Sequence, residues 1–167
     1  MRSYFVRKII IHPEYNYLSN DNDIAIMTPS QTVTENDDVS PICVTNTPIP
    51  YFFDHECVVT GWGSTDQGSG STVDKLQQVY IRVLKEELCK SAIPEYNPHT
   101  MVCGAVGTRG QDACKGDSGG PFACLNQNGL WDLIGVVSFG LRCGSGELLP
   151  GVYTNVYTYS TWIGQTA

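Results

Sequence analysis

Residues 111–121 read Gln-Asp-Ala-Cys-Lys-Gly-Asp-Ser-Gly-Gly-Pro, and the interpretation of the whole chain starts from this run. A serine hydroxyl is a weak nucleophile unless a base removes its proton and N–H donors receive the developing oxyanion. The glycines beside Ser118 let the backbone turn sharply and aim consecutive N–H groups into one small space. The alternative is a glycine-rich turn that holds an ordinary serine, because short motifs often match by chance.

Two enzyme architectures carry a serine in such a segment. In an α/β-hydrolase the serine lies on a strand-to-helix turn, and the acid and the histidine follow it in the chain. Here Gly119, Gly120 and Pro121 follow Ser118 and oppose the start of a helix. All three histidines of the chain, at positions 12, 55 and 99, precede Ser118. The α/β-hydrolase interpretation is therefore excluded.

The run resembles the nucleophile segment of the chymotrypsin–trypsin family, and further resemblances lie in order along the chain. The resembling segments are the acid strand, the first strand of the second barrel, the two pocket walls and the C-terminal helix: Asn22-Asp23-Ile24-Ala25-Ile26, Cys57-Val58-Val59-Thr60-Gly61-Trp62-Gly63, Val137-Ser138-Phe139-Gly140, Pro150-Gly151-Val152-Tyr153 and Tyr159-Ser160-Thr161-Trp162-Ile163. The resemblance implies an all-β fold: a trypsin-like double β-barrel with the second barrel complete, the first barrel partial and a short C-terminal helix.

Composition agrees with this fold class. The 167 residues are one domain's worth of chain, and 41% are hydrophobic, enough for a sizeable core. A net charge of −7 without basic runs argues against nucleic acid as a partner. No apolar stretch approaches the length that spans a membrane. The glycines and prolines lie between short segments rich in β-branched residues, as in antiparallel β proteins.

We expect one peptidase domain in four parts. A remnant of the first barrel covers 1–27, and a proline-punctuated extended linker covers 28–55. The second barrel covers 56–156 and the C-terminal helix covers 157–166. We expect one short helix over 85–91. The expected strands are at 5–11, 23–27, 57–62, 77–84, 101–105, 121–125, 130–139 and 151–156.

Seven cysteines in 167 residues indicate an oxidising compartment, although spacing alone does not define the pairing. The resemblance implies three disulfides, and Cys43 is then left over. In many two-chain relatives the matching cysteine bridges to a propeptide, and we expect such a partner for Cys43; a free exposed thiol is the alternative. The implied disulfides are Cys57–Cys124, Cys89–Cys103 and Cys114–Cys143.

The first residues suggest that the chain begins inside a domain. Three basic residues interrupt the stretch 1–8, so it does not read as a secretory signal segment. An Ile-Val-Gly-Gly start, which becomes the new amino terminus on activation in this family, is also not recognisable. We therefore expect a secreted, extracellular protein whose N-terminal part is missing from this sequence.

The catalytic base is the missing member of the site. In this family the order along the chain is His, Asp, Ser, and only His12 precedes Asp23. His12 lies in Ile11-His12-Pro13-Glu14-Tyr15, which resembles a surface loop of the family, whereas the catalytic histidine has an Ala-His-Cys context. His55 and His99 are interpreted as surface residues. The sequence therefore offers no base for Ser118.

The resemblance implies roles for the remaining residues. Ser118 is the expected nucleophile, and Asp23 is the buried acid that orients the histidine. The N–H groups of Gly116 and Ser118 form the oxyanion hole. Asp117 is the carboxylate that pairs with the freed α-ammonium of activated relatives.

The resemblance also implies the substrate preference. Asp112 matches the aspartate at the base of the primary pocket in trypsin-like members and would bind Arg or Lys. Gly140 and Gly151 match the pocket walls, where a side chain would block entry. Ser138 and Gly140 would offer backbone hydrogen bonds to an extended substrate.

The sequence thus predicts a serine endopeptidase that cleaves proteins or peptides after Arg or Lys, with no cofactor and no metal. As written, the chain lacks the histidine and is expected to be inactive alone. Two other interpretations stay open: a catalytically inactive homologue that acts as a binding or regulatory module, and a small β-module that is complete in itself.

Overall fold

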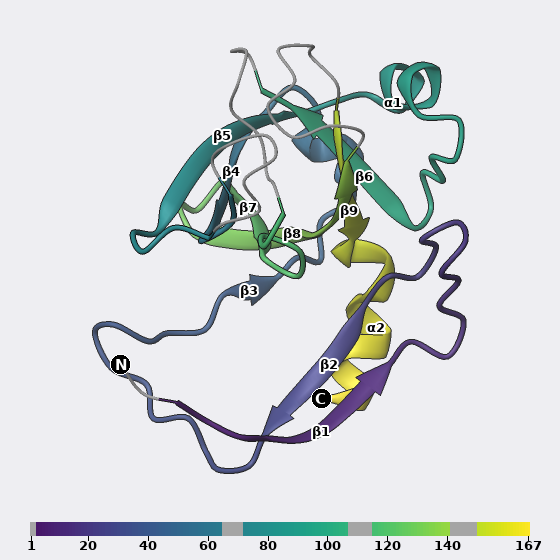
Figure 1. Ribbon diagram of the computed structural model, residues 1–167. Helices are drawn as coiled ribbons and strands as arrows, with labels where there is room; N and C mark the ends of the chain where they lie inside the picture. Colours follow the sequence, from purple (N-terminus) through teal and green to yellow (C-terminus); the bar gives the residue numbers. More distant parts are fainter. Residues whose placement is uncertain (1–2, 65–71, 107–114, 141–149) are drawn as a thin grey trace.

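The computed structural model describes residues 3–64, 72–106, 115–140 and 150–167 (Figure 1). The expected Cys114–Cys143 pairing and Asp112 lie outside these residues. Within the described part of the chain, strands dominate and the helices are short, as the composition predicted. No helix in that part is both long and apolar enough to cross a membrane.

Six strands form a closed antiparallel barrel, the second barrel that the sequence predicted. The order around it is β8–β7–β4–β5–β6–β9, and β9 pairs again with β8 to close the ring. The strands are β4 (Glu56–Gly61), β5 (Gln77–Val83), β6 (Met101–Ala105), β7 (Pro121–Leu125), β8 (Trp131–Gly140) and β9 (Gly151–Asn155).

Alternation along the strands builds the barrel core. In β5, Ile81 and Val83 are fully buried while Tyr80 and Arg82 are exposed, because successive side chains point to opposite faces. Apolar residues of the other strands fill the same interior, among them Val59, Phe122, Ile134 and Tyr153. The disulfide Cys57–Cys124 lies in this core and joins β4 to β7.

A second disulfide, Cys89–Cys103, joins helix α1 (Glu86–Ala92) to β6. Both cysteines are fully buried in a smaller apolar cluster with Ile93, Tyr96 and Met101. The two disulfides confirm the first two pairings that the resemblance implied. Cys43 is a free, exposed cysteine.

The segment 28–55 differs from the extended linker that its prolines suggested. Its first residues belong to β2, and β3 (Cys43–Val44) pairs in parallel with β8. A short 3-10 helix, η1 (Ile49–Phe52), then places Ile49 and Phe52 in the barrel core. Pro50 suits the first turn of this helix, so the proline-rich end of the segment is a packed element.

The first barrel is represented by one antiparallel pair, β1 (Val6–Ile11) and β2 (Ala25–Pro29). Several of its large apolar side chains are exposed, including Val6, Ile9, Ile11 and Met27. Helix α2 (Val156–Thr166) follows β9 directly (Figure 1), and its Tyr159 and Trp162 contact His12, the residue after β1. The loop between β1 and β2 therefore lies where the hairpin, α2 and the barrel meet.

Candidate active site

Ser118 lies in a tight turn that begins at Asp117. The Gly120 N–H donates to the Asp117 carbonyl at 2.8 Å, and Gly119, the third residue of the turn, has a φ of 82°. A positive φ at this position is typical of type II turns and favours glycine. Ser118 itself is exposed.

Two backbone N–H groups of the serine segment, those of Gly116 and Ser118, are the predicted oxyanion donors. Within the described chain, neither the Gly116 nor the Ser118 N–H has a recorded hydrogen-bond acceptor. The Lys115 carbonyl accepts from the Ser64 N–H at 2.8 Å. Because C=O and N–H point in opposite directions across a trans peptide, the Gly116 N–H faces away from Ser64. Both donors are thus available to an oxygen of a ligand.

The Asp117 carboxylate is held in a cradle of two glycines from the end of β4. Its Oδ1 accepts from the Gly63 N–H at 2.8 Å. A methyl group at Gly61 or Gly63 would overlap this carboxylate, so a side chain at either position would force the Asp117 side chain to move. In the sequence, Gly61-Trp62-Gly63 resembles the end of a family strand, and the motif alone does not predict this contact with Asp117.

Asp23 is half-buried and is held from two strands of the barrel. The Ser138 hydroxyl of β8 donates to Asp23 Oδ2 at 2.6 Å, and the Thr154 hydroxyl of β9 donates to the Asp23 carbonyl at 2.5 Å. Ser138 lies at a β-bulge, where the register between β8 and β9 shifts. Because bulges redirect side chains, this irregularity explains how Ser138 reaches Asp23.

The same part of β8 also holds the Ser118 turn. Val137 accepts from the Gly119 N–H and donates to the Gly120 carbonyl, both at 2.9 Å. Its neighbour Ser138 binds Asp23, and consecutive residues of a strand are separated by only about 3.3 Å. The fold therefore fastens the predicted nucleophile and the predicted acid to adjacent residues of one strand.

The predicted pocket walls face each other. Gly140 pairs with Gly151 across β8 and β9. Among the described residues, a methyl group built on Gly140 would meet only the Gly151 Cα, at an ordinary contact distance of 3.8 Å. Asp112, the expected floor of the pocket, lies outside the described residues.

None of the three histidines lies in the hydrogen-bonded group around Asp23 and Ser118 that the structure describes. The His12 ring packs on Tyr159 and Trp162 of α2, with ring centroids 5.2 and 4.9 Å away. The His55 ring packs near Tyr51 at 5.4 Å. In the described part of the chain, no histidine has a recorded hydrogen bond to Asp23 or Ser118.

One carboxylate near the site was missed by sequence reasoning. Asp21 lies two residues before Asp23 and accepts hydrogen bonds from Ser19, Asn97 and Thr100. Partial burial raises the pKa of the Asp21 carboxyl, but these three hydrogen bonds together lower it below its ordinary value of 3.8. No motif signals this contact, because Asn97 and Thr100 are more than 70 positions away in the chain.

The structure has a closed six-stranded barrel and a C-terminal helix, and one strand joins the serine turn to an aspartate. Together these features define a trypsin-like serine protease fold. The family model described as Trypsin matches residues 2–163. The chain therefore belongs to the trypsin family of serine proteases.

Curated relatives agree with this assignment. The chain is similar to transmembrane protease serine 9 of Rattus norvegicus, with 40% identity over 96% of the chain and 15% of that protein. It is 37% identical to the inactive CLIP domain-containing serine protease A8 of Anopheles gambiae, over 96% of the chain and 45% of that protein. It is 34% identical to the serine proteinase stubble of Drosophila melanogaster, over 95% of the chain and 20% of that protein. The chain thus spans less than half the length of each.

Proposed function

We propose that this chain is part of a serine endopeptidase that cleaves proteins or peptides after Arg or Lys through an acyl-enzyme. The observation that carries the proposal is the joint attachment of the Ser118 turn and Asp23 to Val137 and Ser138. A nucleophile and an acid fastened to adjacent residues of one strand suit a histidine that contacts both. This arrangement is the one that acyl transfer by serine requires.

In the proposed reaction the Ser118 hydroxyl attacks the scissile carbonyl while a histidine takes its proton. The carbonyl oxygen becomes negative and is received by the N–H groups of Gly116 and Ser118. Each such donor lowers the barrier by about 3 kcal/mol. Asp23 stabilises the imidazolium that forms, and its Oδ1, which has no recorded hydrogen bond among the described residues, is available to the histidine N–H.

The histidine itself is proposed to come from a segment outside residues 1–167. His12 is supported as a packing residue by its contacts with α2. The α-ammonium that pairs with Asp117 in activated relatives is proposed to come from the same segment as the histidine. Both groups complete the site, so residues 1–167 alone are expected to hydrolyse Arg or Lys substrates poorly if at all.

Asp112 is proposed as the carboxylate at the pocket floor, which binds the guanidinium or ammonium of the substrate. The facing glycines Gly140 and Gly151 support entry of a long side chain. Ser138 and Gly140 are proposed to hydrogen-bond the extended substrate through their backbone groups.

Cys43 is proposed to bridge to a propeptide or N-terminal chain. Its thiol is exposed on β3, while the four other described cysteines are paired in two disulfides. The two disulfides support an extracellular location for the protein.

The test compares the longer protein that carries residues 1–167 with this chain alone. We expect the activated longer protein to cleave peptide amides after Arg and Lys, and a fluorophosphonate to label Ser118 stoichiometrically. Ser118→Ala should abolish both signals. Asp112→Ser should remove the preference for basic residues, while Asp74→Asn, a change at an exposed carboxylate, should leave it intact.

Residues 1–167 alone should show neither rapid hydrolysis nor stoichiometric labelling. Efficient labelling of Ser118 in this chain would contradict the proposal that base and activating ammonium lie elsewhere.

A second candidate function is an inactive homologue that acts as a binding module. The 37% identity to a relative named as inactive favours testing it. A longer protein that cleaves no Arg or Lys peptide and yet binds a partner tightly would establish this alternative. The presence of Ser118, Asp23 and Asp112 together argues against it, since binding alone has no chemical need of all three.

A further inference from the structure

The loop between β1 and β2 is fastened to the barrel by one carboxylate. Asp21 Oδ1 accepts from the Thr100 hydroxyl at 2.6 Å and from Asn97 Nδ2 at 2.9 Å. Its Oδ2 accepts from the Ser19 hydroxyl at 2.9 Å. Hydrogen bonds to a charged acceptor are stronger than neutral ones, so this group, which we call the Asp21 clamp, is a firm attachment.

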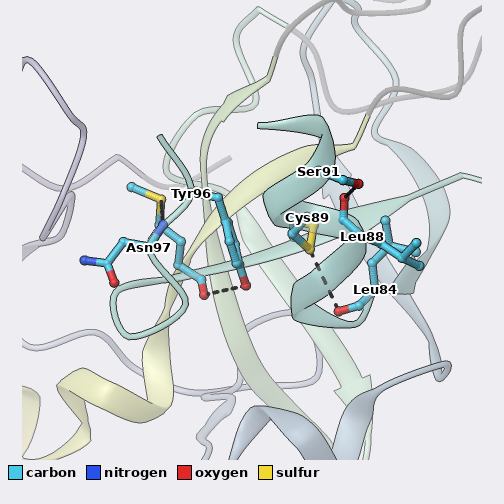
Figure 2. Close-up of a disulfide and its surroundings, with 8 residues drawn as sticks. Leu84, Leu88, Cys89, Ser91, Tyr96 and Asn97 are labelled. Atoms are coloured by element: carbon cyan, nitrogen blue, oxygen red, sulfur yellow. Dashed lines mark hydrogen bonds between the residues drawn. A yellow bond between two sulfur atoms is a disulfide. The ribbon is translucent and has the colours of Figure 1, made fainter. Parts of the chain in front are cut away.

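The barrel side of the clamp is held by a disulfide and by hydrogen bonds. Asn97 and Thr100 lie between α1 and β6, which the buried Cys89–Cys103 disulfide joins. In Figure 2 Tyr96 lies close to this disulfide, and the Asn97 amide points away from it. The Tyr96 hydroxyl donates to the Met101 carbonyl at 3.2 Å, and the Met101 N–H donates to the Asn97 carbonyl at 2.8 Å. The two donors to Asp21 therefore belong to a fixed loop.

The other side of the clamp has an unusual backbone. Asn20 and Asn22, which flank Asp21, both have a φ of 57°. Asn adopts this left-handed conformation more readily than most other residues besides glycine, but the conformation stays uncommon and persists where the surroundings hold it. Asn22 is held as well, because its Oδ1 accepts from the Tyr159 hydroxyl of α2 at 2.8 Å. The loop conformation thus depends on contacts with the barrel and with α2.

The residue after Asn22 is Asp23, whose carboxylate binds Ser138. Three consecutive residues are therefore attached to three different places: Asp21 to the loop at 97–100, Asn22 to α2, and Asp23 to β8. We propose that Asp21 is a positioning residue, and that its clamp onto Thr100 and Asn97 holds Asp23 at the distance from Ser138 and Ser118 that the reaction needs. This inference rests on the proposed function.

The proposed effect on catalysis follows from geometry. Asp23 acts by orienting a histidine, so a displacement of its carboxylate moves the base away from Ser118. Misplacement of a catalytic group by about 1 Å costs about a hundredfold in rate. Asp21 touches neither the substrate nor the reacting atoms, so its removal should lower kcat and leave KM nearly unchanged.

The experiment uses four variants of the longer active protein. Asp21→Ala and Thr100→Val remove the hydrogen bond, and Val preserves the shape of Thr. Thr100→Ser keeps the hydroxyl, and Asp21→Asn keeps an oxygen that accepts both bonds to Oδ1. Asp54→Asn serves as the control, because Asp54 is an exposed carboxylate that contacts Lys85 outside the loop.

We expect Asp21→Ala and Thr100→Val to lower kcat by about 10- to 100-fold with KM within about twofold. Thr100→Ser, Asp21→Asn and Asp54→Asn should stay within about threefold of the wild type. Hydrogen exchange of the amides of residues 19–24 should accelerate in the first two variants only. Unchanged exchange at 19–24, or a lower melting temperature with unchanged kcat, would overturn the inference.

The exchange measurement separates this inference from the proposed function. If the wild-type protein cleaves no Arg or Lys substrate while exchange at 19–24 accelerates in Asp21→Ala and Thr100→Val, the clamp stands and the proposed function fails. If the wild type is active and the variants keep its kcat, the proposed function stands and the clamp has no positioning role.

Discussion

Single residues in this protein are held by specific neighbours, and Asp117 illustrates how tightly. Its carboxylate lies against the Cα positions of Gly61 and Gly63 and accepts the Gly63 N–H. The glycines are needed here for close approach rather than for a special backbone angle. Asp117 and Ser118 are neighbours, so this cradle also fixes the turn that presents the serine.

A methyl group in the cradle should therefore destabilise the protein. We expect Gly63→Ala to lower the free energy of unfolding by about 1–3 kcal/mol, because the carboxylate must move and its hydrogen bond is lost. Chemical denaturation measures this change. Gly164→Ala is the matched control: a methyl group there meets no atom within 4 Å, and alanine favours the helix by about 1 kcal/mol. An equal change in the free energy of unfolding for Gly63→Ala and Gly164→Ala would contradict the close contact between Gly63 and the Asp117 carboxylate.

The lowered pKa of Asp21 predicts a dependence of stability on pH. The folded carboxyl has a pKa below its ordinary value of 3.8, so the unfolded chain binds the proton more readily. The stabilisation by Asp21 is thus fully present above 3.8 and is lost as the pH falls through the folded pKa. The difference in free energy of unfolding between wild type and Asp21→Asn should shrink over that window. If this difference grew as the pH fell, the pKa of Asp21 would be raised rather than lowered on folding, and the prediction would be wrong.

At the scale of elements, helix α1 and strand β6 together support the candidate active site. The Cys89–Cys103 disulfide joins them, and the apolar side chains of Ile93, Tyr96 and Met101 pack around it. The loop that presents Asn97 and Thr100 to Asp21 lies directly between these two elements. A short helix thereby becomes part of the support of the candidate active site.

Replacement of both cysteines by alanine should measure this support. The disulfide closes a loop with a sequence separation of 14 residues, and such a loop stabilises by about 3 kcal/mol. We expect a loss of that order in the free energy of unfolding of the Cys89→Ala/Cys103→Ala variant. Glu86→Gln on the same helix removes only an exposed pair with Lys90 and should cost less than about 0.5 kcal/mol. A similar cost for both variants would refute a supporting role of the disulfide.

The molecule as a whole combines a closed barrel with an incompletely covered strand pair. The barrel buries Phe52, Ile81 and Phe122 completely, whereas 57% of Ile9 and 65% of Met27 are exposed in the β1–β2 pair. Contacts with α2 and the Asp21 clamp attach this pair at one end. Local stability should therefore differ strongly between the two parts.

Hydrogen exchange on residues 1–167 should resolve this difference. Amides of β1 and β2 are expected to exchange much faster than those of β4 and β7, because few buried apolar contacts protect them. An apolar dye should bind the chain, and substitution of Ile9 by a polar residue such as threonine should weaken that binding. Protection of β1 equal to that of β4 would mean that the exposed apolar face is covered in solution.

The sequence by itself determined the fold class and most strand positions, and it predicted Ser118 as nucleophile and Asp23 as acid. Alternating apolar residues define strand faces, as in β5, and the motifs around the serine and the aspartate are contiguous in the chain. Only the tertiary structure decided that Phe52 enters the core, that a bulge turns Ser138 toward Asp23, and that Asp21 binds Asn97 and Thr100. The physical reason is that these contacts join residues up to 115 positions apart, through irregular segments without a hydrophobic period. Closure of the barrel brings them together.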